Sequence, residues 1–337
     1  MKALVLHEPF KFEYVTMPIP TPAEGELLLK VKTVGICGTD IHAYSGKQPF
    51  FSYPRILGHE ICAEVVDVAD PNSTMKVGQR VAVIPCVPCY TCHACQQGST
   101  NCCEKVSLFG VHQDGGFREY LTTPEKNVVR VPDEVSDSAA ALIEPFAIAA
   151  HAVARGGVQA NEDVLVIGAG PIGIGIAAIA KAYGANVVVA DTQASRRQHI
   201  EKVLALPTAD PLADDFNQRL MAQFNGQMAK TVIDATGNAA SMNKAVTLLR
   251  HTGKLVFVGL FIGELNINDP EFHKRETTLF GSRNATRKDF EKVIELLQKG
   301  LIDENMMKSH EFSFQDLGDY ENTVVKNKEL LKGVIRF

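Results

Sequence analysis

Four cysteines lie in one short stretch of the sequence and have the spacing of metal ligands. Cys89, Cys92, Cys95 and Cys103 follow the pattern Cys-x2-Cys-x2-Cys-x7-Cys. Four thiolates at such spacing can surround one zinc ion in a closed tetrahedral site, which is typical of a structural zinc. The stretch from Cys86 to Cys103 contains no lysine or arginine, which disfavours a zinc ribbon that grips nucleic acid. We therefore predict a structural zinc lobe over residues 86–104.

The cysteine count as a whole also indicates metal binding rather than disulfides. Six of the eight cysteines fall in this one stretch, whereas a disulfide scaffold would be shorter and would spread its cysteines. Within the stretch, Cys86 and Cys102 are alternative thiol ligands, and His93 is a weaker candidate. This use of cysteine indicates a reducing compartment, and the N-terminal MKALVLHEPF lacks the features of a signal peptide. We therefore expect a cytoplasmic protein.

A second set of metal-binding side chains is scattered along the chain. Cys37 lies in GICGTDIH, His59 and Glu60 lie in GHE, and Glu144 lies in IEPF. Sulfur, nitrogen and oxygen donors together suit a catalytic zinc that keeps one position open. Glu60 and Glu144 compete for the last protein-ligand position in this interpretation. Spacing alone does not establish that these segments meet.

A glycine-rich run predicts a dinucleotide site. Gly168, Gly170 and Gly173 in VLVIGAGPIG have the G-x-G-x-x-G spacing between an expected strand and an expected helix. The glycines allow a tight turn and a close approach of the backbone to a pyrophosphate, and the helix N-terminus favours negative charge. Asp191 ends the next expected strand, where a carboxylate can bind the ribose hydroxyls and select NAD over NADP. The arginine pair 196–197 could accommodate a 2′-phosphate, although we interpret it as solvated.

Composition excludes several other classes of function. Apolar residues make up 45% and charged residues 22% of the 337 residues, as in a globular protein. The net charge of −5 gives no general attraction for nucleic acid or anionic membrane. Tryptophan is absent and aromatics are only 7%, which argues against a base-stacking surface. The longest apolar run, Val164–Ala180, contains glycines and a proline and is short for a membrane span.

The elements that must position these residues fall into three segments. Residues 1–150 hold short strand-like runs between turn residues, which predicts an irregular β-barrel: Ala3–Leu6, Glu26–Val34, Ile61–Val68 and Arg80–Ile84. Residues 151–281 alternate strands with helices, which predicts a doubly wound parallel sheet: strands at Val164–Ile167, Asn186–Ala190, Thr231–Asp234 and Lys254–Gly259, and helices at Ile172–Tyr183, Ala194–Leu204 and Ala239–Leu249. Residues 282–337 hold an amphipathic helix, Asp289–Lys299, and a last strand, Lys332–Phe337. Two such short pieces cannot bury a core of their own, so we expect them to return to the first domain.

In order along the chain, GICGTDIH, GHE, the four-cysteine lobe, DGGFREY, EPF, VLVIGAGPIG, Asp191 and DATG form a specific set of motifs. With this set, the chain resembles the zinc-containing medium-chain alcohol and polyol dehydrogenases over essentially its whole length. The resemblance implies a GroES-like catalytic domain, a Rossmann domain and an active site between them. It also implies a homodimer or homotetramer.

The resemblance further implies roles for individual residues. Cys37, His59 and an acidic residue would bind the catalytic zinc, and the four cysteines would bind the structural zinc. Thr39 would take the proton from a bound alcohol and pass it through the cofactor ribose to His42. The residues implied for binding NAD are Gly168, Gly170, Pro171, Ile172, Gly173, Asp191, Arg196, Ala235, Thr236, Val258 and Gly259.

Within this family, several short sequence segments are most similar to those of bacterial sugar-acid dehydrogenases of the L-galactonate 5-dehydrogenase type. GKQPFFSYPRILGHE, GVHQDGGF and GSRNAT carry that similarity. It implies hydride transfer from a secondary alcohol of a sugar acid or polyol to NAD. Alternatives are an L-threonine 3-dehydrogenase, a sorbitol-type dehydrogenase and a non-enzymatic sensor that binds NAD and zinc. Candidates for binding a substrate carboxylate are Lys47, His112, Gln113, Arg118 and Arg283.

Overall fold

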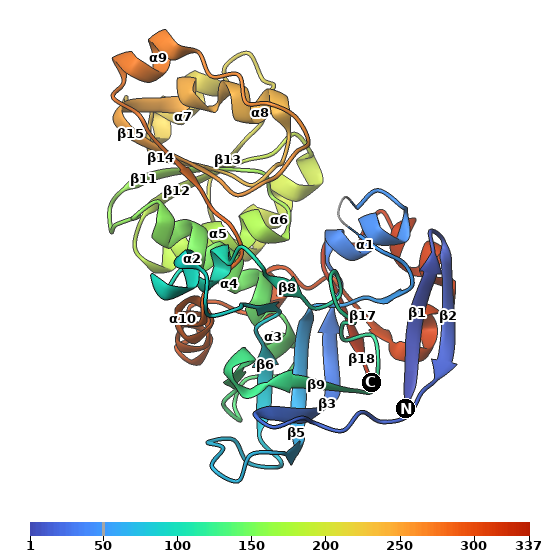
Figure 1. Ribbon diagram of the computed structural model, residues 1–337. Helices are drawn as coiled ribbons and strands as arrows, with labels where there is room; N and C mark the ends of the chain where they lie inside the picture. Colours follow the sequence, from blue (N-terminus) through green and yellow to red (C-terminus); the bar gives the residue numbers. More distant parts are fainter. Residues whose placement is uncertain (49–50) are drawn as a thin grey trace. The chain divides into compact units, whose positions relative to one another are not determined.

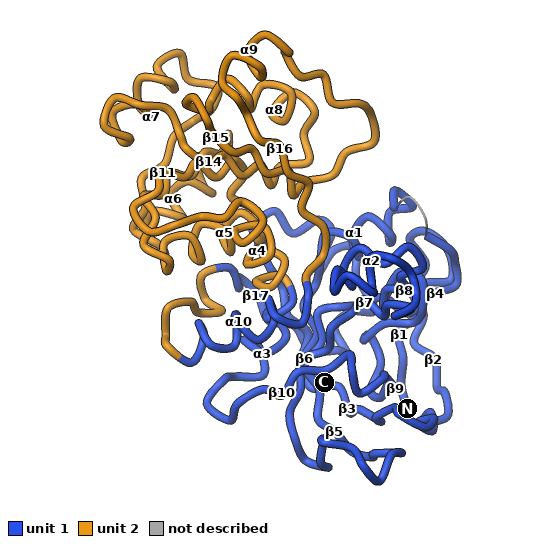
Figure 2. Tube along the Cα trace, turned by 60° about the vertical axis from the view of Figure 1, so that its left-hand side comes forward, with its two compact units in different colours: residues 1–144, 286–298, 307–337 blue, residues 145–285, 299–306 orange. Residues whose placement is uncertain are grey.

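A computed structural model describes residues 1–48 and 51–337 of the chain. The chain divides into two compact units (Figure 2). Unit 1 comprises residues 1–144, 286–298 and 307–337, and unit 2 comprises residues 145–285 and 299–306. Our boundaries near residues 150 and 282 remain predictions about where independent domains begin and end. Among the described residues, no helix is long and apolar enough to cross a membrane.

Unit 1 is built mainly from antiparallel strands. Its larger sheet has the order β10-β6-β5-β3-β18-β17, and β9 also pairs with β3; a smaller sheet has the order β2-β1-β4. The long strand β3 (Glu26–Gly35) alternates buried and half-exposed side chains along most of its length, because successive residues point to opposite faces. The other strands are β1 (Lys2–Glu8), β2 (Lys11–Thr16), β4 (Arg55–Ile56), β5 (Glu60–Val68), β6 (Arg80–Val83), β7 (Cys86–Val87), β8 (Ser107–Leu108), β9 (Tyr120–Pro124), β10 (Val128–Arg130), β17 (His310–Ser313) and β18 (Gly333–Arg336).

Short helices complete unit 1. They are α1 (Gly38–Tyr44), α2 (His93–Gln96), α3 (Asp137–Ala141) and α10 (Arg287–Gln298), and the boundary between units falls inside α4 (Ile143–Arg155). The last part of the chain pairs with the first, because β18 lies antiparallel to β3 with Val334 opposite Gly35. This pairing brings the C-terminal strand beside the strand that leads into Cys37.

Unit 2 is a six-stranded parallel sheet of order β13-β12-β11-β14-β15-β16 (Figure 1). Its strands are β11 (Asp163–Ile167), β12 (Asn186–Ala190), β13 (Thr208–Ala209), β14 (Ala229–Asp234), β15 (Leu249–Phe257) and β16 (Thr278–Gly281). Its helices are α5 (Pro171–Ala182), α6 (Ala194–Leu204), α7 (Phe216–Gln223), α8 (Ala239–Lys244) and α9 (Asp269–Lys274). The residues of β11 are all buried, as expected for a central parallel strand. The predicted combination of a GroES-like domain with a Rossmann sheet is confirmed.

One predicted helix is shorter than its pattern suggested. The expected helix at 239–249 ends at Lys244, continues as a 3₁₀ turn to Leu248, and gives way to β15 at Leu249. The hydroxyl of Thr247 donates to the carbonyl of Lys244 at 2.8 Å, and such a local bond competes with helical bonding. Leu249 pairs instead with Ala229 of β14. The tertiary pairing therefore decides the end of this helix.

Candidate functional site

The four predicted cysteines of the lobe come together around one point in unit 1. The sulfur atoms of Cys89, Cys92, Cys95 and Cys103 all lie within 4.8 Å of one another. Backbone N–H groups point at these sulfurs: that of Cys89 donates to Cys103 Sγ at 3.2 Å, and that of Cys92 donates to Cys89 Sγ at 3.4 Å. N–H donors of this kind stabilise negative sulfur. The site has the donor set and size for a structural zinc.

The four thiols have different surroundings, and their pKa values differ as a result. The side chain and backbone of Thr91 lower the pKa of Cys89 to about 6, whereas desolvation raises the pKa of Cys95 to about 12. Holding all four as thiolates therefore needs the positive charge of a metal. Among the described residues, the metal-binding group in this lobe contains neither Cys86, Cys102 nor His93, in agreement with the simpler four-ligand set.

The second predicted set also converges in unit 1. Cys37 follows β3 and caps helix α1, and His59 precedes β5, which pairs with β3. The ligand atoms of Cys37, His59 and Glu60 lie within 4.8 Å of one another. His59 and Glu60 are buried, and Cys37 is half-buried. A thiolate, an imidazole and a carboxylate at this separation fit a zinc site with an open position.

Asp40 holds the two ligand-bearing segments in place. Its buried carboxylate accepts the N–H of Cys37 at 2.8 Å and the N–H of Gly58 at 3.1 Å. The same carboxylate lies 3.8 Å from His59 Nδ1. This separation is too long for a hydrogen bond, and His59 Nδ1 has no hydrogen-bond partner among the described residues, so Asp40 acts on the ring through its charge. Burial lowers the pKa of His59, but Cys37 and Asp40 outweigh burial and raise it well above its usual value.

The two candidate acidic ligands, Glu60 and Glu144, have different surroundings. Glu60 Oε1 accepts a hydrogen bond from the buried ammonium of Lys332 at 2.5 Å, and Lys332 also donates to the carbonyl of Ile36 at 3.0 Å. Glu60 Oε2 is buried and has no hydrogen-bond partner among the described residues. It lies over Gly35, where a Cβ would approach it to 1.9 Å. The orphaned oxygen and the absence of a side chain at residue 35 are consistent with a carboxylate that can serve a metal.

Glu144 is the other candidate acid, and it is also buried. Burial raises its pKa to about 7, and the charges of His59, Glu60 and Lys332 act on it. The group of atoms within 4.8 Å includes Glu60 but not Glu144. The structure therefore brings Glu60 into ligand range and leaves Glu144 as a neighbouring buried carboxyl.

The predicted proton-relay residues both lie on α1, and the candidates for carboxylate binding are distributed over the two units. Thr39 is half-buried and His42 is exposed on α1. His112 Nδ1 accepts the N–H of Leu108 at 3.1 Å, and Arg118 donates to the carbonyl of Asp114 at 3.1 Å. Of the other candidates, Lys47 is exposed, Gln113 is half-buried, and Arg283 lies in unit 2. These roles remain predictions.

In unit 2 the glycine loop has the geometry that phosphate binding requires. Gly168 has a φ of +97°, which favours glycine. Gly170 caps helix α5 and Pro171 is its first residue, with Ile172 next. A Cβ at Gly173 would lie 1.7 Å from the carbonyl oxygen of Gly168, so only glycine lets the helix start this close. The first turn of α5 thus offers free N–H groups to an anion.

Asp191 is fixed beside this loop by backbone bonds. Its carboxylate accepts the N–H of Ala169 at 2.7 Å and the N–H of Gln193 at 2.8 Å. A cavity of about 950 Å³ lies in unit 2, large enough for a dinucleotide. Six of the predicted cofactor residues line it: Gly168, Gly170, Asp191, Arg196, Ala235 and Thr236. Pro171, Ile172, Gly173, Val258 and Gly259 are not among the lining residues, and their roles remain predictions.

Sequence reasoning missed one residue that shapes this cavity. Asp234, completely buried at the end of β14, accepts the N–H and hydroxyl of Thr236 at 2.8 and 2.6 Å and the hydroxyl of Ser241 at 2.6 Å. It therefore fixes the turn that carries Ala235 and Thr236. The aspartate that opens DATG was a usable signal, because an aspartate commonly bonds to the backbone two residues on.

These sites define a class of protein, and comparison with known proteins shows the same class. Residues 23–133 match the alcohol dehydrogenase GroES-like domain, and residues 171–299 match the zinc-binding dehydrogenase domain. The chain belongs to the zinc-dependent medium-chain alcohol dehydrogenases. The predictions of an enzyme with bound zinc and a nicotinamide cofactor are confirmed.

The chain is also similar over nearly its whole length to individual members of this family. The chain is 56% identical to L-galactonate-5-dehydrogenase of Escherichia coli K12, over 100% of this chain and 99% of that protein. It is 37% identical to the starvation-sensing protein RspB of the same strain, over 95% and 94% of the two chains. Among solved structures, an alcohol dehydrogenase from E. coli CFT073, complexed with NADH, superposes with a TM-score of 0.93 at 34% identity, over 100% and 99% of the chains.

Proposed function

We propose that the enzyme oxidises a secondary alcohol of a sugar acid, with an L-galactonate-like hexonate as the favoured substrate and NAD as the acceptor. The observation that carries this proposal is the 56% identity to L-galactonate-5-dehydrogenase along the whole chain. The convergence of Cys37, His59 and Glu60 supports it, since this is the ligand chemistry that activates an alcohol.

Different residues of the chain have different roles in the proposed reaction. Cys37 and His59 hold the catalytic zinc, which when bound lowers the pKa of a coordinated hydroxyl by several units. Asp40 places a negative charge 3.8 Å from His59 Nδ1. Either Glu60 or Glu144 supplies the third protein ligand. Glu60→Gln and Glu144→Gln distinguish the two, because the variant of the residue that binds the metal will lose the catalytic zinc on dialysis and the other variant will retain it. The lobe of four cysteines keeps the protein folded.

The proton leaves through Thr39 and His42 in this proposal. Thr39 would take it from the substrate hydroxyl, and His42, which is exposed to water, would release it to solvent. A general base that hands its proton to an exposed histidine contributes about 10²–10⁴-fold to such reactions. Thr39→Val and His42→Ala are expected to lower kcat and to change its pH profile, while leaving zinc content and NADH binding intact.

Asp191 supports the preference for NAD. A carboxylate fixed by two backbone N–H groups cannot turn away from a 2′-phosphate, so it repels NADP. Asp191→Ser is expected to shift the ratio of kcat/KM for NAD over NADP toward NADP by about 10–100-fold. An unchanged ratio would contradict this role.

The deciding experiment measures NADH formation with a panel of secondary alcohols, with and without a zinc chelator. L-galactonate is expected to give the highest kcat/KM, ahead of L-idonate, sorbitol and L-threonine, and the chelator is expected to abolish turnover. Faster turnover of L-threonine or sorbitol would assign the enzyme to the alternative substrates.

A sensor is the second candidate function, because a starvation-sensing protein is 37% identical to this chain. In that case NADH and zinc would bind while no alcohol on the panel is oxidised. The retention of Cys37, His59 and Thr39 favours the enzyme, since a sensor needs no proton relay. Cytoplasmic location and a homodimer or homotetramer also belong to the proposal; the clustering of the cysteines supports the first, and the resemblance supports the second.

A further inference from the structure

The cavity of unit 2 continues beyond the residues that were predicted to bind the cofactor. Its further walls are the loop after β13, the start of α7, and α8 with the 3₁₀ turn that follows it. In a Rossmann domain the pyrophosphate lies at the glycine loop and the ribose at the acidic residue, which here is Asp191. The adenine base is attached to that ribose, so the remaining part of the cavity is the space for the base.

This part of the cavity offers apolar side chains on which a flat ring can lie. Phe216 and Leu248 are buried, whereas Leu212 is 77% exposed, and all three line the cavity. The N–H of Leu212 donates to the Asp210 carboxylate at 2.9 Å, and Asp210 pairs with Arg197 at 3.3 Å. The loop therefore holds Leu212 in place although solvent surrounds it. Apolar walls of this kind are typical of a site that binds a ring by its faces.

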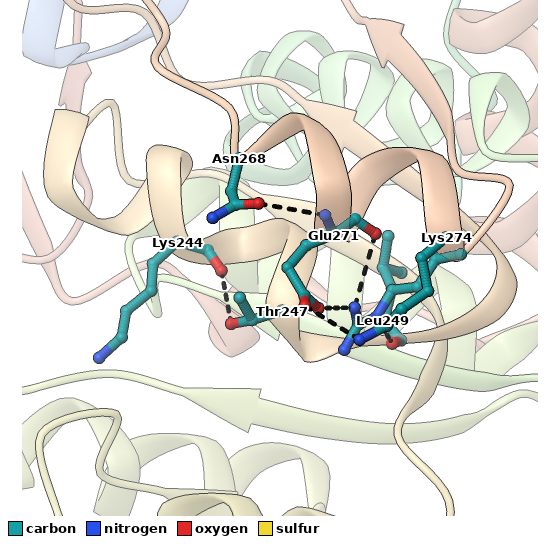
Figure 3. A network of polar contacts seen from close by, with 7 residues as sticks. Lys244, Thr247, Leu249, Asn268, Glu271 and Lys274 are labelled. Atoms are coloured by element: carbon teal, nitrogen blue, oxygen red, sulfur yellow. Dashed lines mark hydrogen bonds and ion pairs between the residues drawn. The ribbon is translucent and has the colours of Figure 1, made fainter.

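One cation in the same part of the cavity has an ammonium without a partner. Lys244 is the last residue of α8 and lines the cavity on the same helix face as Ala240 and Ser241. Figure 3 shows its side chain running away from the polar network around Glu271, and no dashed line reaches its ammonium. Glu271 is already paired with Lys274 at 2.9 Å and with Arg275. Across residues 1–48 and 51–337, no hydrogen bond or ion pair of the Lys244 ammonium is found.

The backbone that carries Lys244 is fixed at both ends of its helix. At the start of α8, the side chain of Asn238 accepts the N–H of Ser241 at 3.1 Å, and Asp234 accepts the Ser241 hydroxyl at 2.6 Å. At its end, the Thr247 hydroxyl donates to the carbonyl of Lys244 at 2.8 Å (Figure 3). The other cation of the lining, Arg196, already donates to the carbonyl of Ala169 at 3.3 Å. Lys244 is therefore the cationic donor that this wall leaves available to a ligand.

We propose that Lys244 is a specificity residue for the adenine base of the cofactor and donates a hydrogen bond to one of its ring nitrogens. An ammonium has three N–H donors and no acceptor, and the nitrogens N1, N3 and N7 of adenine are acceptors along the edges of the ring. Lys244 contacts the base and not the reacting atoms, so it strengthens NAD binding without changing the rate of hydride transfer. This inference rests on NAD as the cofactor and not on the choice of sugar acid.

Calorimetric titration of the full-length protein with AMP and with its 1-deaza, 3-deaza and 7-deaza analogues tests this contact. In each analogue a C–H group replaces one ring-nitrogen acceptor. One of the three analogues is expected to bind the wild-type protein about five- to tenfold more weakly than AMP does. Lys244→Met keeps a side chain of similar size without the donor, so it is expected to bind AMP and that analogue equally. The comparison is a thermodynamic cycle between one side chain and one ligand atom.

Lys202→Met is the matched control, because Lys202 is an exposed lysine of α6 outside the cavity. This variant should keep the wild-type difference between AMP and its analogues, and circular dichroism confirms that both variants are folded. In steady-state kinetics, Lys244→Met should raise the KM for NAD about five- to tenfold and leave kcat unchanged, as expected when binding is lost equally from the ground and transition states. Lys244→Arg retains a donor and should restore part of the loss.

Three results would overturn the proposal. If all three analogues bind the wild-type protein as tightly as AMP, no ring nitrogen accepts a hydrogen bond. If Lys244→Met weakens AMP and all three analogues by the same factor, the ammonium acts on the phosphate instead of the base. If AMP does not bind the wild-type protein, the base has no site in this cavity. The titration contains no sugar acid, so an incorrect assignment of the substrate would leave its result unchanged.

Discussion

Replacing Lys332 by methionine removes the ammonium that the Glu60 carboxylate binds. The two side chains are 3% and 1% exposed, and Nζ lies 2.5 Å from Oε1 of Glu60. Burial acts to lower the pKa of Lys332, but Glu60 and Cys37 outweigh it and raise that pKa, so the lysine remains charged. Methionine fills similar space without a charge. The variant therefore leaves a buried carboxylate with no cation beside it.

The expected cost follows from that unpaired charge. Removing one partner of a buried ion pair costs about 3–5 kcal/mol of unfolding free energy. The loss should be near the upper end in the zinc-free protein, because Glu60 Oε2 already has no hydrogen-bond partner. A zinc ion at the proposed ligands Cys37 and His59 would supply a positive charge within reach of Glu60. We therefore expect the metal to reduce the loss to about half or less.

Urea unfolding followed by circular dichroism measures the loss of unfolding free energy in the zinc-free and in the zinc-bound protein. The matched control is the double variant Lys332→Met with Glu60→Gln, in which neither member of the pair is charged. Its loss should be smaller than the sum of the single losses by about 2 kcal/mol or more, as expected for residues in direct contact. A loss below about 1 kcal/mol for Lys332→Met in the zinc-free protein would refute the reasoning, as would strict additivity in the double variant.

Three further predictions test the other contacts. Gly35→Ala places a Cβ 1.9 Å from Glu60 Oε2 and should destabilise the protein by about 2–4 kcal/mol in urea unfolding. The same substitution added to Glu60→Ala, which has no carboxylate at that place, should cost much less than it does in the wild-type protein. Cys95→Ser should remove one zinc per chain in metal analysis and lower the melting temperature, whereas Cys102→Ser, exposed and outside the group, should change neither. Burial raises the pKa of Glu125, but hydrogen bonds from Ser73 and Thr74 outweigh it and lower the folded-state pKa. Its stabilisation is therefore present above the unfolded-state pKa and is lost as the pH falls through the folded-state pKa. Glu125→Gln should cost about 0.5–1 kcal/mol at neutral pH, after allowance for solvent, and almost nothing in acid; an equal cost at both pH values would contradict the shift.

The local parts of the sites were predictable, and the parts that depend on distant residues were not. The spacing of Cys89, Cys92, Cys95 and Cys103 encodes the lobe, because short loops close around one ion. The strand–turn–helix at Gly168 and the carboxylate of Asp191 were likewise readable from periodicity and glycine placement. In contrast, nothing near Glu60 in the sequence indicates Lys332, since strand pairing between β18 and β3 makes that contact.

Asp40 shows the same limit of prediction from sequence, over a shorter separation along the chain. A turn or cap role was readable from its place three residues after Cys37, and the structure does show that bond. Its second bond, to Gly58, and its approach to His59 arise only when β3 and β5 pair. The end of α8 was mispredicted for a related reason, because helix periodicity extends to Leu249 but the pairing of β15 begins there.

The distance along the chain between Lys332 and Glu60 has a consequence for protein synthesis. Cys37 and His59 leave the ribosome close to Glu60, whereas the ammonium that pairs with Glu60 is synthesised 272 residues later. Until then the nascent barrel lacks both β18 and the counter-charge for a carboxylate that folding would bury. This half of the enzyme therefore cannot mature before Lys332 has left the ribosome, and a transcript interrupted before that codon would yield a product with its metal-binding residues present but unsupported.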